Sequence, residues 1–273
     1  MEHDDDIPVG RILTRREALA LLGAAMLAGC APGLSGTAQP TSGPTQAPSS
    51  GSTPAPSSVP AQATSAASTD TLPSCVVRPA LTEGPYFVDE MINRSDIRSD
   101  PSDGAVKDGA PLNLTVRVSQ IDGSGCTPLV GAQVDIWHCD AAGIYSDVSD
   151  PGFNTSGQKF LRGYQVTDEN GTVQFTTIYP GWYQGRAVHI HFKIRTGLAE
   201  GEASFYEFTS QWFFDESLTD QVHSQQPYAE KGQRTLKNDG DGIYQQSGGQ
   251  TLLDVVQSGE DYAATFDIGL QMS

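Results

Sequence analysis

The chain has 273 residues and a formal net charge of −17 at neutral pH, from 33 acidic and 16 basic side chains. Nucleic acids and anionic surfaces repel a protein with such an acidic excess, so neither is an expected partner. The longest uncharged apolar run near the start, residues 18–29, is too short to span a bilayer stably.

Residues 1–30 have the features of an export signal. Arg15 and Arg16 precede the apolar run, which ends in LAG directly before Cys30. A basic pair, a short apolar region and a small-residue cleavage site are typical of such signals. The Arg pair resembles the twin-arginine type, and LAGC resembles a bacterial lipobox in which Cys30 is lipidated. We therefore expect twin-arginine export, giving a lipoprotein on the extracellular face of the cell membrane or a secreted protein; the alternative is a small apolar N-terminal helix.

Residues 31–72 are almost entirely Ser, Thr, Pro, Ala, Gly and Gln, and Asp70 is their only charged residue. Such a segment buries too little apolar surface to offset the entropy lost on ordering, so we expect a disordered tether. We expect the protein to contact the membrane only through the lipid anchor, because the tether holds the folded domain away from it. The remainder, 73–273, has a normal size for a single domain.

Three cysteines follow Cys30, namely Cys75, Cys126 and Cys139. Outside the cytoplasm, the natural expectation for three cysteines is one disulfide and one free thiol. The spacing leaves the pairing open.

The domain has the sequence pattern of an all-β protein. Several segments alternate between apolar and polar residues with period two, and turn pairs such as Asp122-Gly123 and Asn170-Gly171 separate them. No amphipathic stretch of helical period is comparable in length. We expect an antiparallel β-sandwich core with long Gly-, Ser- and Asp-rich loops. The strand-like segments are 112–119, 132–139, 171–179, 187–194, 210–215 and 262–270.

The segment RAVHIHFKI, residues 186–194, combines a core face with a polar face. In a strand, residues two apart share a face, so His189, His191 and Lys193 lie opposite an apolar row. Two imidazoles on one face can converge on one metal ion. The alternative is a pair of histidines that only form hydrogen bonds at the surface of a strand.

Several kinds of metal site use the His-x-His pattern. A cupin site would have a Glu where this chain has Arg195 and Thr196, and a facial-triad Fe(II) site would have a carboxylate in place of one His. A three-histidine zinc site would need His138 or His223, for which the spacing offers no support. That site, as the centre of a zinc hydrolase, remains an alternative.

Two tyrosines upstream favour Fe(III). Tyr183 lies six residues before His189, and Tyr145 follows a Gly in AAGIYSD. A phenol with a pKa of about 10 binds only a metal that is acidic enough to take its proton. Two phenolates, two neutral imidazoles and a hydroxide would balance the 3+ charge of Fe(III). The alternatives are a turn aromatic for Tyr145 and packing against Trp182 for Tyr183.

These motifs resemble the intradiol ring-cleavage dioxygenase family, to which protocatechuate and catechol dioxygenases belong, in its short extracellular bacterial form. The resembling text runs from LTEGPYF (81–87) to Asp215 and includes GAQVDIWHCDAAGIYSD and TSQWFFD. The order Tyr, Tyr, Arg, His-x-His, with the Arg three residues before the first His, is the pattern of the family.

The resemblance implies that one Fe(III) per chain is bound by two tyrosines and two histidines. It implies catalytic roles for Tyr183, for Arg186 as the cation beside the substrate, and for Gln211 as the active-site glutamine; taken alone, Arg186 could form a surface ion pair and Gln211 could be a strand-edge amide. The implied ligands are Tyr145, Tyr183, His189 and His191.

The implied reaction joins a catechol-type substrate and O2 to give a cis,cis-muconate-type diacid, with Tyr183 able to take up a substrate proton. The short QGRAV linker between Tyr183 and His189 leaves the preferred catechol open. The helical segment through which the catechol enzymes dimerise has no counterpart in the resembling text, so the oligomeric state is open too. The alternative function is a non-catalytic β-sandwich lipoprotein that binds carbohydrate or protein.

Overall fold

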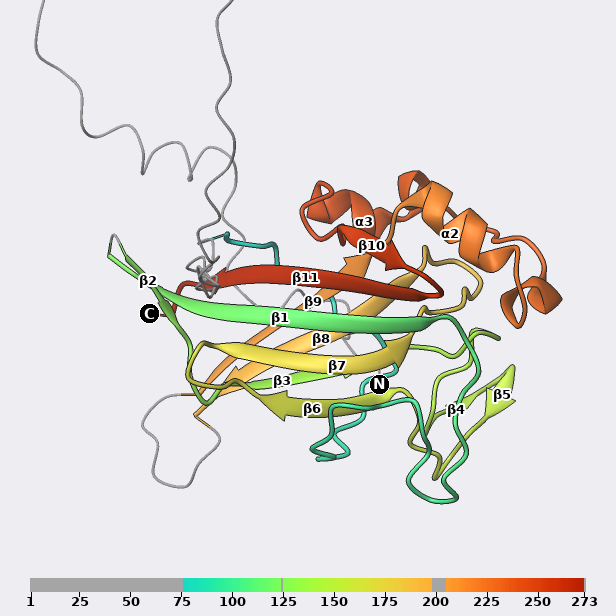
Figure 1. Cartoon of the computed structure of the whole chain (residues 1–273), viewed down its shortest axis with the longest axis horizontal. Coiled ribbons are helices and arrows are strands. Elements are labelled where there is room, and N and C mark those ends of the chain that lie inside the picture. The colour runs from blue at the N-terminus through green and yellow to red at the C-terminus, as the bar shows by residue number, and fades with distance from the viewer. Residues whose placement is uncertain (1–75, 124, 198–204, 273) are drawn as a thin grey trace, which may run out of the picture. The chain divides into compact units, whose positions relative to one another are not determined.

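The computed structural model describes residues 76–123, 125–197 and 205–272, and β-strands dominate them (Figure 1). The predicted export signal, the predicted tether and Cys30 lie outside these residues. None of the helices in the described ranges is long and apolar enough to cross a bilayer.

The first of two large sheets is built around a long central strand. β1 (Pro111–Asp122) pairs along one side with β11 (Asp261–Leu270), and β11 pairs in turn with β10 (Val255–Ser258). On its other side β1 pairs first with β7 (Thr172–Ile178) and then with β2 (Gly125–Pro128). The pairing of β1 with β11 is parallel, whereas the other pairings of this sheet are antiparallel.

The second sheet carries the candidate site. Its strand order is β6 (Arg162–Val166), β3 (Gln133–Trp137), β8 (His189–Thr196) and β9 (Tyr206–Phe213), and all of its pairings are antiparallel. The register of β8 places His191 opposite Trp137 of β3 on one side and opposite Gln211 of β9 on the other. Residues from three neighbouring strands therefore lie side by side at His191.

Helical elements follow β9 and lie beside the end of the sandwich (Figure 1). Asp215 begins the first of them by accepting a hydrogen bond from the backbone N–H of Leu218 with its side chain. A small hairpin between β3 and β6 completes the secondary structure. The helical elements are α2 (Glu216–His223), η1 (Tyr228–Lys231), η2 (Asn238–Gly240) and α3 (Gly242–Ser247), and the hairpin is β4 (Ser149–Asp150) with β5 (Phe153–Asn154).

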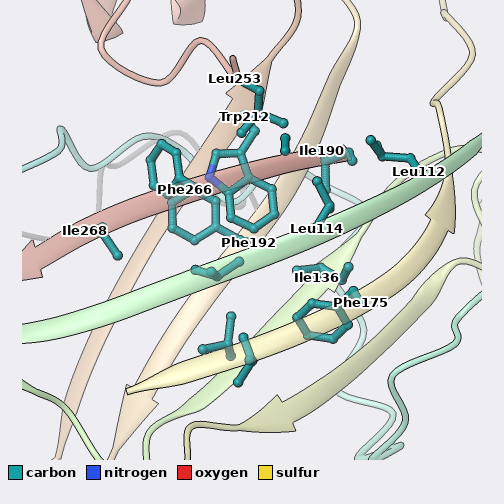
Figure 2. Packing of buried hydrophobic residues seen from close by; sticks show 14 of the residues in the cluster. Leu112, Leu114, Ile136, Phe175, Ile190, Phe192, Trp212, Leu253, Phe266 and Ile268 are labelled. Carbon is teal, nitrogen blue, oxygen red and sulfur yellow. The ribbon is translucent and has the colours of Figure 1, made fainter. Parts of the chain in front are cut away.

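The two large sheets pack face to face through their apolar rows. Leu112 and Leu114 of β1 point toward Ile190 and Phe192 of β8 in the core (Figure 2). The ring of Phe266, from β11, lies 5.6 Å from that of Phe192. Burial of such side chains stabilises the fold by about 1.5–3 kcal/mol each. The all-β sandwich that the alternation predicts is the observed fold.

All six predicted strands form, although their ends differ from the prediction. β1 continues to Asp122, and β9 begins at Tyr206 instead of 210. The alternation did not reveal β2, β6 or β10, which are four or five residues long. The parallel pairing of β1 with β11 departs from the expected antiparallel arrangement. It joins segments from opposite ends of the domain, which local alternation does not register.

The described cysteines agree with the expectation of one disulfide and one free thiol. Cys126 is disulfide-bonded, whereas Cys139 is a free, buried thiol. Burial raises the pKa of the Cys139 thiol to about 12, so it stays protonated and unreactive at neutral pH. Cys75 lies outside the described residues.

Candidate metal centre

The polar face of β8 is buried instead of facing solvent. His189, His191, Lys193 and Arg195 share this face, and each is 7% exposed or less. The alternation of β8 predicted the face correctly, because Ile190, Phe192 and Ile194, on the opposite face of the strand, lie in the core. What covers the polar face is a segment far upstream in the sequence.

That segment, residues 81–94, is attached to β8 through charges and an aromatic ring. Lys193 forms an ion pair with Glu83, and its ammonium nitrogen lies 4.0 Å from the centre of the Phe87 ring. Arg195 binds Asp89, with 2.7 Å between Nη1 and Oδ2. Buried charges are tolerated only when they are paired, so Lys193 and Arg195 require these partners from the covering segment.

The structure brings the four predicted ligands together. The Nε2 atoms of His189 and His191 lie 2.9 Å apart. The phenol oxygens of Tyr145 and Tyr183 lie 3.5 and 3.4 Å from the same Nε2 atom of His189. Donor atoms bound to one ion at about 2.0–2.2 Å lie about 3–4 Å from one another, so this spacing suits a shared metal.

The hydrogen bonding of His189 leaves a lone pair directed at the cluster. Its Nδ1 atom lies 2.7 Å from the carbonyl oxygen of Ala187, and a carbonyl only accepts, so Nδ1 carries the proton. Nε2 is then the unprotonated nitrogen, which is the form that binds a metal. In His191, the buried Nδ1 has no hydrogen-bond partner among the described residues.

Tyr145 is held by its backbone and by a stacked ring. Its carbonyl oxygen accepts a hydrogen bond from the Thr155 hydroxyl at 2.6 Å. Its ring stacks on Tyr86, with 4.5 Å between centroids. Arg162, 3% exposed, donates to the hydroxyl and the carbonyl of Ser146 and to the carbonyl of Tyr86. The loop that carries Tyr145 is therefore tied to the segment that covers β8.

Tyr183 lies on the connection between β7 and β8. Its ring is nearly perpendicular to that of Tyr145, at 76° and 5.7 Å between centroids. Gly181 lets this connection approach the loop before Tyr145 closely. A Cβ at Gly181 would lie 2.4 Å from the carbonyl oxygens of Asp140 and Ala141, so no other residue fits there.

Burial keeps the four side chains neutral in the absence of a cation. It lowers the pKa of His189 and of His191 well below 6.5. It raises the pKa of Tyr145 well above 10 and that of Tyr183 to about 12, the latter against the opposing charge of Arg186. Two neutral imidazoles and two phenols suit a strongly acidic metal, which would supply the charge that ionises the phenols.

Arg186 and Gln211 form one hydrogen-bonded unit beside the cluster. Nη2 of Arg186 donates to Oε1 of Gln211 at 2.6 Å, and Nε2 of Gln211 donates to the carbonyl oxygen of Thr82 at 2.8 Å. Nη1 of Arg186 lies 3.5 Å from Nε2 of His189. Gln211 is fully buried and the Arg186 side chain is 16% exposed, so neither is a mere surface group.

One residue of the site was missed from the sequence. Asp241 is 2% exposed, and its carboxylate accepts a hydrogen bond from Nε of Arg186 at 2.9 Å. It belongs to the run NDGDG, which indicates only a turn. No local pattern connects it with Arg186, which lies 55 residues earlier.

The three-histidine alternative has no support in the structure. Nδ1 of His138 lies 2.8 Å from the carbonyl oxygen of Cys139, and its Nε2 lies 2.6 Å from the Thr177 hydroxyl. Nε2 of His223 lies 3.0 Å from the carbonyl oxygen of Pro180. Within the described ranges, no group of three or more His, Cys, Asp and Glu side chains is arranged to hold a metal ion.

A cavity of about 430 Å³ opens beside the cluster. Tyr183 lines it, whereas Tyr145 does not reach it and is fully buried. A small aromatic molecule fits such a volume. The wall includes aromatic and aliphatic side chains and one residue of each charge, namely Tyr86, Ile144, Phe153, Asp150 and Lys231.

This fold and this site have counterparts among known proteins. A dioxygenase family model, Dioxygenase_C, matches residues 82–222, which is about half of the chain. An intradiol ring-cleavage dioxygenase from Tetranychus urticae is similar in structure, with a TM-score of 0.62 and 33% identity over 72% of this chain and 95% of that one. The chain belongs to the intradiol ring-cleavage dioxygenase family.

Curated relatives are similar over shorter stretches. A chlorocatechol 1,2-dioxygenase from Pseudomonas putida is 27% identical over 50% of this chain and 53% of its own length. A catechol 1,2-dioxygenase from Acinetobacter baylyi is 35% identical over 38% of this chain and 32% of its own length. The matches therefore span about half, or less, of these relatives.

Proposed function

We propose that the protein is an Fe(III)-dependent intradiol dioxygenase, which cleaves catechol-type rings between the two hydroxylated carbons with O2. Ring opening places both atoms of O2 in the product, a cis,cis-muconate-type diacid. The observation that carries the proposal is the convergence of two imidazole nitrogens and two phenol oxygens around Nε2 of His189. Curated relatives of the chain are named catechol and chlorocatechol 1,2-dioxygenases, which supports the same substrate class.

Tyr145, Tyr183, His189 and His191 would hold one iron per chain. When bound there, Fe(III) supplies a Lewis acid that binds the catecholate and makes its ring reactive toward O2. The donor set supports this assignment, because phenolate oxygen is a hard ligand and the phenols, at their raised pKa, ionise only for a strongly acidic ion.

The two tyrosines differ in their access to substrate. Tyr183 lines the cavity, and Tyr145 is sealed behind it under the stacked ring of Tyr86. We assign to Tyr183 the uptake of a proton from the entering catechol at its phenol oxygen. Tyr145 keeps a structural role in the ligand set.

Arg186 supplies fixed positive charge where the substrate becomes negative. Its Nη1 is the guanidinium nitrogen directed at the cluster, because Nε and Nη2 are used by Asp241 and Gln211. A cation held in place before the reaction stabilises developing charge without the cost of reorganisation, an effect worth about 10²–10³ in rate for a single donor.

Visible absorption and oxygen uptake test the proposal together. The purified, iron-loaded protein should be red-brown from tyrosinate-to-Fe(III) charge transfer, and Tyr183→Phe should weaken or shift the band. Tyr206→Phe is the matched control, since Tyr206 begins β9 and takes no part in the cluster. Oxygen uptake with catechol, protocatechuate or hydroxyquinol should follow the band. A colourless iron-loaded protein would contradict the proposal, and a coloured protein without turnover would favour the non-catalytic binding protein.

Export and lipid attachment remain part of the proposal, since residues 1–75 lie outside the described ranges. The support is the order of Arg15, Arg16, the apolar run and Cys30. Metabolic labelling with palmitate should mark the wild-type protein and leave Cys30→Ala unlabelled. Labelling of both proteins would contradict lipidation at Cys30.

A further inference from the structure

We propose that Asp241 is the positioning residue of this site: its carboxylate fixes the guanidinium plane of Arg186, so that Nη1 stays directed at the cluster. The inference rests on the proposed function, for which Arg186 is the charge-stabilising group. Asp241 lies beyond residues 82–222, the part of the chain that the family model matches. The role is thus assigned from the contacts of this chain alone.

The carboxylate of Asp241 is fully used, and each oxygen has its own task. Oδ2 accepts from Nε of Arg186 at 2.9 Å and from the backbone N–H of Ala187 at 2.7 Å. Oδ1 accepts from the backbone N–H groups of Ile243 and Tyr244 at 2.8 and 3.1 Å, which caps α3. One buried carboxylate therefore joins the start of a helix to the arginine of the site.

The geometry leaves Arg186 a single free direction. The carboxylate of Asp241 occupies Nε and the amide of Gln211 occupies Nη2. A guanidinium is planar, so two anchored nitrogens determine the position of the third. That third nitrogen, Nη1, is 3.5 Å from Nε2 of His189. Without Asp241, Nε would lose its anchor, and the contact with Gln211 at Nη2 would no longer be enough to fix the guanidinium plane.

The support beneath Asp241 is itself anchored to the sandwich. Asn238 donates from its side chain to the carbonyl oxygen of Phe214 at 2.9 Å, and its backbone N–H donates to Glu216 at 2.7 Å. The ring of Tyr244, from α3, packs edge-on against Phe213 of β9 at 5.1 Å between centroids. A rigid support is what a positioning residue requires, because its effect depends on holding a direction.

The test separates the ion pair from the helix cap. In Asp241→Ser the hydroxyl can still cap α3, but it is too short to bind Arg186. We expect kcat for catechol to fall at least tenfold, with little change in KM, while the tyrosinate-to-Fe(III) band persists.

Asp241→Asn is the second variant. Its amide oxygen can accept a hydrogen bond from Arg186 or cap α3 but not both, and we expect a loss of kcat smaller than that of Asp241→Ser. Ser247→Ala is the matched control in α3, because among the residues described the Ser247 hydroxyl forms hydrogen bonds only with Tyr244 and Gly249 and not with Asp241 or Arg186, and its kcat should equal that of the wild type.

A double-substitution cycle decides whether Asp241 acts through Arg186. If it does, adding Asp241→Ser to Arg186→Met lowers kcat no further than Arg186→Met alone. Losses that multiply, or an Asp241→Ser enzyme with wild-type kcat, would overturn the inference.

Nuclear magnetic resonance gives a readout that is independent of turnover. In the iron-free protein, where no unpaired electrons broaden the signal, the Nε–H resonance that is lost in Arg186→Lys should exchange slowly with solvent in the wild type and rapidly in Asp241→Ser. If that resonance exchanges rapidly in the wild type, the contact is not held in solution and the inference fails. If it is protected but no catechol is consumed, the proposed function fails, and with it the role of the contact in catalysis.

Discussion

Trp137 and His191 face each other across the pairing of β3 and β8, with ring centroids 4.9 Å apart and only 8° between the planes. Both side chains are 1% exposed. The indole therefore fixes the plane of an imidazole whose Nδ1 has no hydrogen-bond partner among the described residues. In this site, stacking on Trp137 orients the candidate metal ligand His191, whose Nδ1 no hydrogen bond from the described residues holds.

Replacing Trp137 should therefore affect both stability and iron. We expect Trp137→Ala to lower the free energy of unfolding by about 3–5 kcal/mol, the usual cost of removing a large buried ring. Trp137→Phe should cost less and should keep the iron band, because a ring still stacks on His191. Urea unfolding and a titration with ferric citrate measure the two effects. An Ala variant with wild-type iron affinity would show that the stacking does not orient His191.

Gly84 offers a test of how closely the covering segment approaches the site. Its φ is +73°, and a Cβ there would lie 3.3 Å from Cε1 of His191. Gly84→Ala should cost about 1–2 kcal/mol of stability for the left-handed backbone and should also displace the imidazole, which weakens iron binding. The measurements are thermal unfolding and the intensity of the visible band.

Gly104→Ala is the matched control for that substitution. Its φ is +77°, and a Cβ there would meet nothing within 4 Å. We expect a similar loss of stability and an unchanged visible band. Equal effects of the two substitutions on iron would refute the close approach of Gly84 to His191.

Tyr86 combines a stacking role with a place in the cavity wall. Its ring lies 4.5 Å from that of Tyr145, and its hydroxyl donates to Asp150 at 2.8 Å. Tyr86→Phe keeps the stacking and should leave the charge-transfer band in place, with a stability change below about 1 kcal/mol for a hydrogen bond at the surface. Tyr86→Leu removes the stacked ring and should shift the band. Identical spectra for the two variants would show that Tyr86 does not influence Tyr145.

The part of the candidate site that could be predicted from sequence is the part whose residues lie close together in the chain. The alternation of β8 separates His189 and His191 from the core, and the spacing from Tyr183 and Arg186 adds a pattern that can be recognised within ten residues. Tyr145 needed the resemblance to a family, because nothing in AAGIYSD shows that its ring reaches β8. Its position depends on Arg162 and Ser146, which hold the loop in space.

Long-range contacts explain what the sequence did not reveal. The covering segment 81–94 reaches β8 through Lys193 and Arg195, whose charges indicated no partner in advance. Asp241 lies in a turn-like run, and only the packing of α3 against β9 brings it to Arg186. The parallel pairing of β1 with β11 was missed for the same reason, because it joins segments that are far apart in the sequence. Alternation shows which face is buried, but it does not show which distant segment buries it.

His138 should make the stability of the domain depend on pH between about 4 and 6.5. It is 1% exposed, and burial lowers its pKa to about 4 from the ordinary 6.5. In that window the unfolded imidazole binds a proton that the folded one does not, so the unfolding free energy rises with pH. One group contributes up to about 1.4 kcal/mol per pH unit, and its contribution is complete above pH 6.5.

Comparison with His138→Asn isolates this contribution. The Asn amide can donate to the carbonyl oxygen of Cys139, as Nδ1 of His138 does at 2.8 Å, but it does not titrate. Urea unfolding of the iron-free proteins, measured from pH 4 to 8, avoids any contribution from loss of the metal. We expect the two curves to run parallel above pH 6.5 and the wild-type curve to fall more steeply below it. Parallel curves throughout would mean that the buried imidazole of His138 takes up its proton as readily in the folded chain as in the unfolded one.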